Sequence, residues 1–270
     1  MSSPQNPWPE PGLVPVPEQP APLTAIPSED PVWGGWDVLQ IVFLTLVSVF
    51  VFLSLVGVAV QRLLYPKIPI LEVMVYPLVA VLGQAFAYLL ILGFMVSIVK
   101  RVPSQDFWLA IRWNWPKNWA TYLLAGVALS FALQGIAHFL PIPKELPMDR
   151  FFRTPGEAWV LSLFGVTFAP LLEELFFRGF LYPVLARRLG VVIAVLATAA
   201  GFSLIHAPQL GRAWGPVLVI FMVGLALTIT RAVTKSVAAG LIMHMAYNGT
   251  LSVLLFVGTD GFRHLERLNQ

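Results

Sequence analysis

Two neighbouring glutamates, Glu173 and Glu174, interrupt an apolar run that is otherwise suited to a lipid bilayer. Arg178 follows Glu174 by four residues, so these two side chains share one helix face and can form an ion pair. Glu173 is turned by about 100° from Glu174 and cannot use the same arginine equally well. The spacing therefore predicts a partnered carboxylate at Glu174 and a free one at Glu173.

Two histidines and an asparagine lie in other apolar stretches of the chain. His206 follows Phe202 by four residues, and Asn248 follows His244 by four, so each pair shares a helix face. Lipid penalises polar and ionisable side chains. We therefore expect these groups to converge with the glutamates inside a helix bundle, away from the acyl chains.

The chemistry that fits these residue types is hydrolysis of a peptide bond. A glutamate beside a histidine can deprotonate a water molecule, which then attacks a carbonyl carbon. The oxyanion formed in that attack needs hydrogen-bond donors, and an imidazole and a carboxamide one helical turn apart are suitable. The zinc-protease pattern H-E-x-x-H does not occur, and the chain has no cysteine. An aspartyl dyad is disfavoured because the aspartates outside the N-terminal region lie at or near predicted span ends: Asp37, Asp106, Asp149 and Asp260.

The composition places most of the chain in a membrane. Hydrophobic residues make up 57% of the chain and charged residues 11%, with a mean hydropathy of +0.77. A soluble protein carries about 25% charged residues, so lipid must solvate most of this surface. The net charge of +3 is attributed to basic loops, and no nucleic-acid partner is implied. The expected partners are the lipid bilayer and a membrane-associated peptide or protein substrate.

Hydropathy predicts an all-α, polytopic transmembrane bundle of about seven spans, within a range of about six to eight, with the polar site inside the bundle. A helix that crosses the hydrocarbon core needs about 20 residues. The predicted spans cover residues 38–60, 72–99, 118–140, 158–187, 190–207, 214–231 and 236–257.

The first 36 residues differ in composition from the rest of the chain. Residues 1–36 contain ten of the 23 prolines and no lysine or arginine, and no cleavable signal peptide is visible, so we expect a disordered, proline-rich tail. Residues 37–270 then form one transmembrane protease domain. The first span has basic residues only at its C-terminal flank, Arg62 and Lys67, which favours an external N-terminus and an internal C-terminus.

The predicted helices bring the polar residues to a similar depth. Glu173 lies about 15 residues before the turn at 188–190, and His206 lies about 16 residues after it, so both are about 22–24 Å from that turn. The shared site should therefore lie nearer the face that carries the loops 141–157 and 208–213.

The motifs resemble those of a known family. Three ordered patterns in successive spans are similar to the motifs of the CPBP family, the CAAX prenyl endopeptidases and bacteriocin-processing enzymes also called Abi proteins: Glu173-Glu174-x-x-x-Arg178, Phe202-x-x-x-His206 and His244-x-x-x-Asn248. The resemblance covers about residues 158–257, the predicted core of the domain. It implies an α-helical intramembrane endopeptidase that acts in CAAX-type or leader-type processing.

The resemblance also implies a role for each site residue. Glu173 and His206 would activate water, and His244 and Asn248 would form the oxyanion hole. Glu174 would belong to the supporting pair that holds the catalytic glutamate in place.

Arg178 would be the other member of that supporting pair. The family has been described as metalloproteases, and Glu173, His206 and His244 could bind Zn²⁺ as two histidines and a glutamate. A glutamate-activated water with an asparagine-assisted oxyanion hole needs no metal, and we favour this metal-free interpretation, with no cofactor.

Two other functions stay open at this point. Buried glutamate and histidine also build proton relays in transporters, although the internal repeat expected of many transporters is not visible. A catalytically silent membrane scaffold is also compatible with the sequence. The chain has no organelle-targeting presequence, so we expect it in a bacterial plasma membrane.

Overall fold

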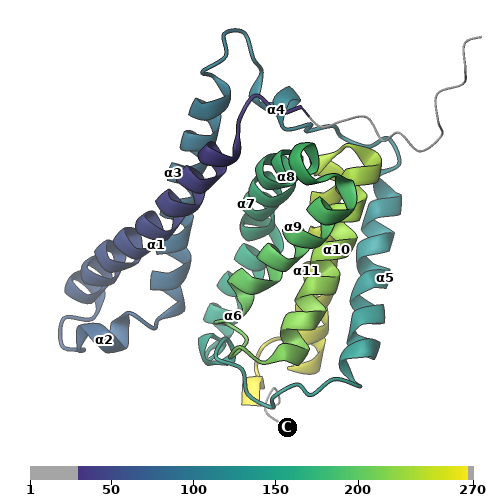
Figure 1. Cartoon of the computed structure of the whole chain (residues 1–270). Coiled ribbons are helices and arrows are strands. Elements are labelled where there is room, and N and C mark those ends of the chain that lie inside the picture. The colour runs from purple at the N-terminus through teal and green to yellow at the C-terminus, as the bar shows by residue number, and fades with distance from the viewer. Residues whose placement is uncertain (1–29, 267–270) are drawn as a thin grey trace, which may run out of the picture.

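The computed structural model describes residues 30–266, and the elements in this range are all helical (Figure 1). The long helices are α1 (Gly35–Leu64), α3 (Pro77–Val99), α5 (Trp119–Ala137), α9 (Val191–His206), α10 (Trp214–Thr234) and α11 (Val237–Gly258). The short ones are α2 (Ile70–Val73), α4 (Phe107–Ala110) and a 3-10 turn (Asp149–Phe151). The all-α, polytopic class predicted from the sequence is confirmed.

The glutamate motif lies on an unbroken helical stretch, Pro155–Leu189, whose hydrogen bonding changes along its length. It consists of α6 (Pro155–Leu163), a first π-helical turn (Phe164–Phe168), α7 (Ala169–Glu174), a second π-helical turn (Leu175–Leu181) and α8 (Tyr182–Leu189). Such wide turns within α-helices occur often at functional sites. Both glutamates therefore stand on a short α-helical segment between two π-helical turns.

Six of the described helices are long and apolar enough to cross a membrane, and α9 is a shorter apolar helix of 16 residues. Large apolar side chains point outward along them; Phe43, Leu46 and Phe50 of α1 are each about 70% exposed. This apolar surface suits acyl chains and not water. The chain is thus an integral, multi-pass membrane protein.

The observed helices match the predicted spans, with one division that hydropathy did not show. The predicted span 72–99 is split into α2 and α3, because Pro77 lies in the first turn of α3 and follows an extended Tyr76. Gly190 makes the turn between α8 and α9 with φ +79° and ψ 163°, a conformation that L side chains rarely adopt.

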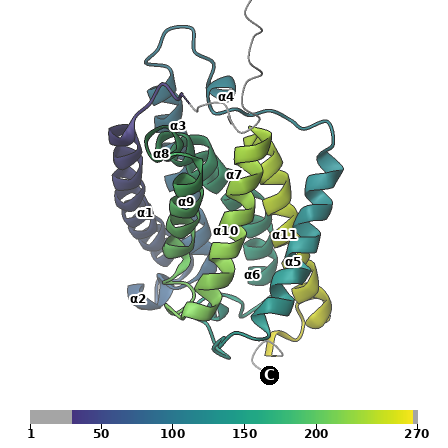
Figure 2. The ribbon, with the colours of Figure 1, turned by 45° about the vertical axis from the view of Figure 1, so that its right-hand side comes forward.

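The helices form two groups that Figures 1 and 2 show from different sides. Helices α1 and α3 pack along each other as a hairpin, while α5 packs along α11, and α9 along α10. The α5–α11 contact is close, because a Cβ at Gly126 would lie 2.3 Å from the carbonyl oxygen of Met243. The Pro155–Leu189 stretch contacts both groups, so the glutamates stand between them.

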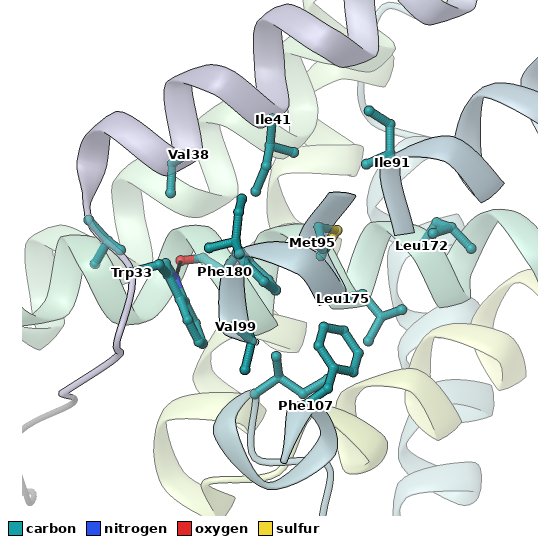
Figure 3. Packing of buried hydrophobic residues seen from close by; sticks show 13 residues of the cluster. Trp33, Val38, Ile41, Ile91, Met95, Val99, Phe107, Leu172, Leu175 and Phe180 are labelled. Carbon is teal, nitrogen blue, oxygen red and sulfur yellow. Dashed lines mark hydrogen bonds between the residues drawn. The ribbon is translucent and has the colours of Figure 1, made fainter. Parts of the chain in front are cut away.

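A buried apolar cluster joins the two groups near the N-terminal end of α1 (Figure 3). We call it the Trp33 cluster, and it consists of Trp33, Val38, Ile41, Ile91, Met95, Ile98, Val99, Phe107, Ile111, Leu172, Leu175, Phe180 and Val184. The hairpin contributes six of these 13 residues, and α7 and the second π-helical turn contribute three. The hairpin is therefore anchored directly beside the helix that carries the glutamates.

The predicted tail needs correction at its C-terminal boundary. Residues 1–29 lie outside the described residues, but Trp33, which was assigned to the tail, is only 2% exposed. Its ring stacks on Phe180, and its indole N–H donates to a backbone carbonyl. Burial of a large ring with a satisfied N–H outweighs the cost of ordering a short segment, so Trp33 belongs to the packed structure and not to a disordered tail.

Candidate functional site

The ion pair expected within the glutamate motif is present and fully buried. Arg178 Nη1 lies 2.8 Å from Glu174 Oε1, and neither side chain has any exposed surface. The other guanidinium nitrogens donate to α10, with Nη2 3.0 Å from the carbonyl oxygen of Gly224 and Nε 3.2 Å from Thr228 Oγ1. Because all three guanidinium nitrogens are bonded, Arg178 ties the second π-helical turn to α7 and α10.

Glu174 in turn orients His244, one of the two site histidines. The Nδ1–H of His244 donates to Glu174 Oε1 over 2.9 Å. The second oxygen, Oε2, is buried with no hydrogen-bond partner, and it points toward Gly240 of α11. A carboxylate only accepts hydrogen bonds, so it places the proton of His244 on Nδ1 and turns Nε2 toward the site.

His206 is oriented by the backbone of its own helix. Its Nδ1 lies 2.7 Å from the carbonyl oxygen of Phe202, which only accepts, so Nδ1 carries the proton and Nε2 is left for the site. The Phe202 ring contacts the groups around it, 4.7 Å from the Arg178 guanidinium, 4.8 Å from the His206 ring and 5.7 Å from the His244 ring. The sequence predicted a packing role for Phe202, and the structure adds that its ring packs against the guanidinium and both imidazoles.

Glu173 faces the free nitrogen of each histidine. Its Oε1 is 3.9 Å from His206 Nε2, and its Oε2 is 3.8 Å from His244 Nε2. These distances are too long for direct hydrogen bonds, and the carboxylate is only 12% exposed. The spacing leaves room for a small ligand atom, such as a water oxygen, to lie between the carboxylate and an imidazole.

Asn248 is held by the first π-helical turn. Its side-chain amide donates to the carbonyl oxygen of Gly165 over 2.7 Å, which uses one of its two N–H groups. Asn248 lies one helical turn after His244 on α11 and lines the same cavity. The second N–H is therefore available to a ligand.

A cavity of about 630 Å³ contains all four predicted catalytic side chains, Glu173, His206, His244 and Asn248. Most of its other lining residues are apolar. It extends to the connections on one side of the molecule, where Met148 and Gln209 lie and are joined by a backbone hydrogen bond of 3.2 Å. The cavity thus approaches the face that carries the loops 141–157 and 208–213, where the sequence predicted the site to lie.

The arrangement of Glu173, His206 and His244 bears on the zinc alternative. Both imidazoles present Nε2 beside Glu173 with Nδ1 bonded to an acceptor, which is also the orientation of metal-ligating histidines. Within residues 30–266, however, no three His, Asp or Glu side chains have the arrangement needed to hold a metal ion. Glu174 and Arg178 bind each other, and Glu173, His206 and His244 do not form a metal-holding group.

Several partners of the site were not predicted. Thr228 and Gly224 gave no signal, because a threonine in an apolar helix usually bonds the carbonyl four residues earlier, as Thr228 also does here. Gln84 of α3 also lines the cavity and donates to the hydroxyl of Tyr88 over 2.6 Å. Because Gln84 is a polar residue within the predicted span 72–99, its position in the sequence could have identified it as a candidate site residue.

Comparison with known protein families gave a match over the helices that carry the site. Residues 155–250 match a family model described as type II CAAX prenyl endopeptidase Rce1-like. No curated protein and no solved structure matched the chain. The matched residues include both glutamates, Arg178, both site histidines and Asn248, and they exclude α1, α3 and α5.

Proposed function

Since residues 155–250 are an Rce1-like domain of the type II CAAX prenyl endopeptidases, in agreement with the CPBP resemblance of the motifs, we propose how this membrane peptidase cuts its substrate. The reaction is hydrolysis of a peptide bond in a membrane-associated peptide or protein, as in CAAX-type or leader-type processing. The observation that carries the proposal is the convergence of Glu173 with His206 and His244 inside one cavity.

Glu173 is the general base in this proposal. A water between its carboxylate and His206 Nε2 gives a proton to Glu173 while its oxygen attacks the carbonyl carbon of the scissile bond. The electron pair of the C=O bond moves onto the carbonyl oxygen. When the tetrahedral intermediate collapses, the electron pair of the oxyanion re-forms the C=O bond, the C–N bond breaks, and the proton held by Glu173 passes to the leaving amine. Proton and electrons therefore balance over the two steps.

His244 and Asn248 stabilise the oxyanion. Asn248 offers its second N–H, since the first is bonded to Gly165. His244 can donate from Nε2 only when Nε2 is protonated as well, because its Nδ1–H is bonded to Glu174. The resulting imidazolium would lie between two carboxylates, Glu173 and Glu174, and Arg178 supplies the fourth charge of an electrically balanced cluster.

The shape of the cavity supports a substrate that reaches the site from the membrane boundary. Its lining is mostly apolar and it extends to the loops at one end of the bundle, so an extended peptide could enter beside acyl chains. We place the protein in a bacterial plasma membrane, with the site toward the cytoplasmic face. Gln84 offers a polar contact for the peptide backbone in this lining.

The test is cleavage of a tagged membrane peptide by the purified protein in detergent. Glu173→Gln keeps the size of the side chain and removes the base, so cleavage should fall by at least about 10²-fold while the melting temperature stays unchanged. Glu72→Gln, at an exposed carboxylate outside the cavity, is the matched control and should cleave like the wild type. Full activity in Glu173→Gln would refute the assignment of the base.

Chelation decides the metal question in the same assay. We expect cleavage to persist after treatment with a strong zinc chelator, because no step of the proposed reaction uses a metal. Loss of activity that added Zn²⁺ restores would favour the two-histidine, one-glutamate alternative instead. Absence of any cleavage, with retained binding of the peptide, would favour the scaffold function.

A further inference from the structure

The N-terminal segment just before α1 contacts the helical stretch that carries the catalytic glutamate. Trp33 stacks on the Phe180 ring with centroids 4.3 Å apart and an interplanar angle of 22°. Its indole N–H donates to the backbone carbonyl oxygen of Phe180 over 3.0 Å, and Figure 3 shows the two side by side. Phe180 belongs to the second π-helical turn, two residues after Arg178.

The backbone of this segment is fastened a second time, at α8. Arg187 Nη1 lies 2.9 Å from the carbonyl oxygen of Pro31, and its Nη2 lies 3.1 Å from that of Trp33. Arg188 covers Gly35, where a Cβ would meet its Nη1 at 3.1 Å. Trp33 is thus held against the turn by contacts on both sides.

The register of this turn matters for the site. Each residue of an α-helix turns the chain by about 100°, so a change in the hydrogen bonding of the turn would rotate Arg178 relative to α7. Arg178 fixes Glu174, and Glu174 fixes the ring of His244. A group that holds the turn in its wide form therefore acts on the site through these buried bonds.

We propose that Trp33 is a positioning residue of the peptidase, which keeps the second π-helical turn in the form that aligns Arg178, Glu174 and His244. The inference rests on the proposed function. Trp33 lies outside the cavity and outside residues 155–250, so it acts on the rate of the chemical step and not on substrate binding.

Two substitutions distinguish the effect of the indole hydrogen bond from that of simple packing. Trp33→Phe keeps a stacked ring and removes the N–H donor, while Trp33→Ala removes both. Trp36→Phe is the matched control, because Trp36 lies three residues away and is 71% exposed. In full-length protein, Trp33→Phe should lower kcat by about threefold to tenfold, the effect of one buried hydrogen bond, with KM unchanged. Trp33→Ala should lower kcat further.

A second measurement does not depend on activity. Hydrogen exchange followed by mass spectrometry should show faster exchange in Trp33→Phe, confined to peptides that cover Leu175–Leu181, and no change in Trp36→Phe. Unchanged exchange in this turn, or a kcat equal to that of the control, would overturn the proposal. A lowered melting temperature with wild-type kcat would also overturn it, since the role would then be structural only. If the wild type itself cleaves nothing, the proposed function fails, and exchange alone decides the role of Trp33.

Discussion

Gly240 of α11 lies directly against the buried carboxylate of Glu174. A Cβ at this position would be 2.8 Å from Glu174 Oε2, which is closer than side-chain atoms normally approach. A flexible carboxylate could turn away from such a clash, but this one is bonded to Arg178 and His244 and has no exposed surface. The absence of a side chain at Gly240 is therefore part of the site.

We predict that Gly240→Ala damages both stability and activity. Overpacking in a buried region costs about 1–3 kcal/mol, and the displaced carboxylate would lose its bond to His244. The melting temperature in detergent and kcat on a tagged peptide should both fall. Gly249→Ala, on the same helix, is the control, because its Cβ would make an ordinary contact of 3.7 Å with Val166. Equal behaviour of the two variants would contradict the close contact at Gly240.

The sequence was sufficient to select the candidate site residues, but it predicted only some of their hydrogen-bond and ion-pair partners. The four-residue spacing of Glu174 and Arg178 specified their ion pair, because neighbours on one helix face need no tertiary information. The bond between Glu174 and His244 joins residues 70 positions apart. No spacing rule specifies such a pair, and the same holds for Asn248 and the Gly165 carbonyl.

At the scale of the elements, one turn sets how the glutamate helix faces the helix of His206. Gly190 joins α8 to α9 with φ +79° and ψ 163°, although no neighbouring atom would touch a Cβ there. The requirement for glycine is therefore conformational. Hydropathy predicted a turn near residue 190, yet it carries no information on backbone angles.

We predict that Gly190→Ala lowers the free energy of unfolding by about 1–3 kcal/mol, the cost of this backbone region for a residue with a side chain. Cleavage should fall as well, since relief of the strain would tilt α9 relative to α8. Gly156→Ala, a helical glycine of α6 that is equally free of neighbours, should be neutral or slightly stabilising. The melting temperatures of both variants provide the comparison.

The π-helical turns mark a limit of sequence-based prediction for the elements. The predicted span 158–187 corresponds to the stretch Pro155–Leu189, so its apolar character was sufficient to find it. The residue pattern of this mostly apolar stretch does not distinguish α from π hydrogen bonding, and the two π-helical turns pack against other helices of the bundle, α1, α9 and α11. Trp33 was missed for a similar reason, because a single aromatic in a proline-rich segment gives no periodic signal.

For the whole molecule, the outward apolar surface requires a bilayer, and α1 offers a direct test. Phe50 lies near the middle of α1 and is 72% exposed, whereas Leu63 lies at its end and is 80% exposed. Phe50→Arg places a charge at the centre of the hydrocarbon, which costs about 2.5–3.5 kcal/mol on insertion scales. An arginine at position 63 can reach the interface.

We therefore predict that Phe50→Arg reduces the fraction of protein that stays in the membrane after alkaline extraction, and that Leu63→Arg does not. The two substitutions introduce the same side chain at similarly exposed positions, so only depth differs between them. Equal membrane fractions for both variants would argue that α1 does not cross the bilayer.

The length of α9 has a consequence for how a hydrolase obtains its second reactant. Its 16 residues span about 24 Å, which is less than the hydrocarbon thickness of about 30 Å, and the helix ends at His206. A helix that stops early draws the polar boundary inward on that side, and lipid headgroups must dip to meet it. We therefore expect the short helix to bring water close to His206, whose side chain is 20% exposed, in a region otherwise flanked by acyl chains.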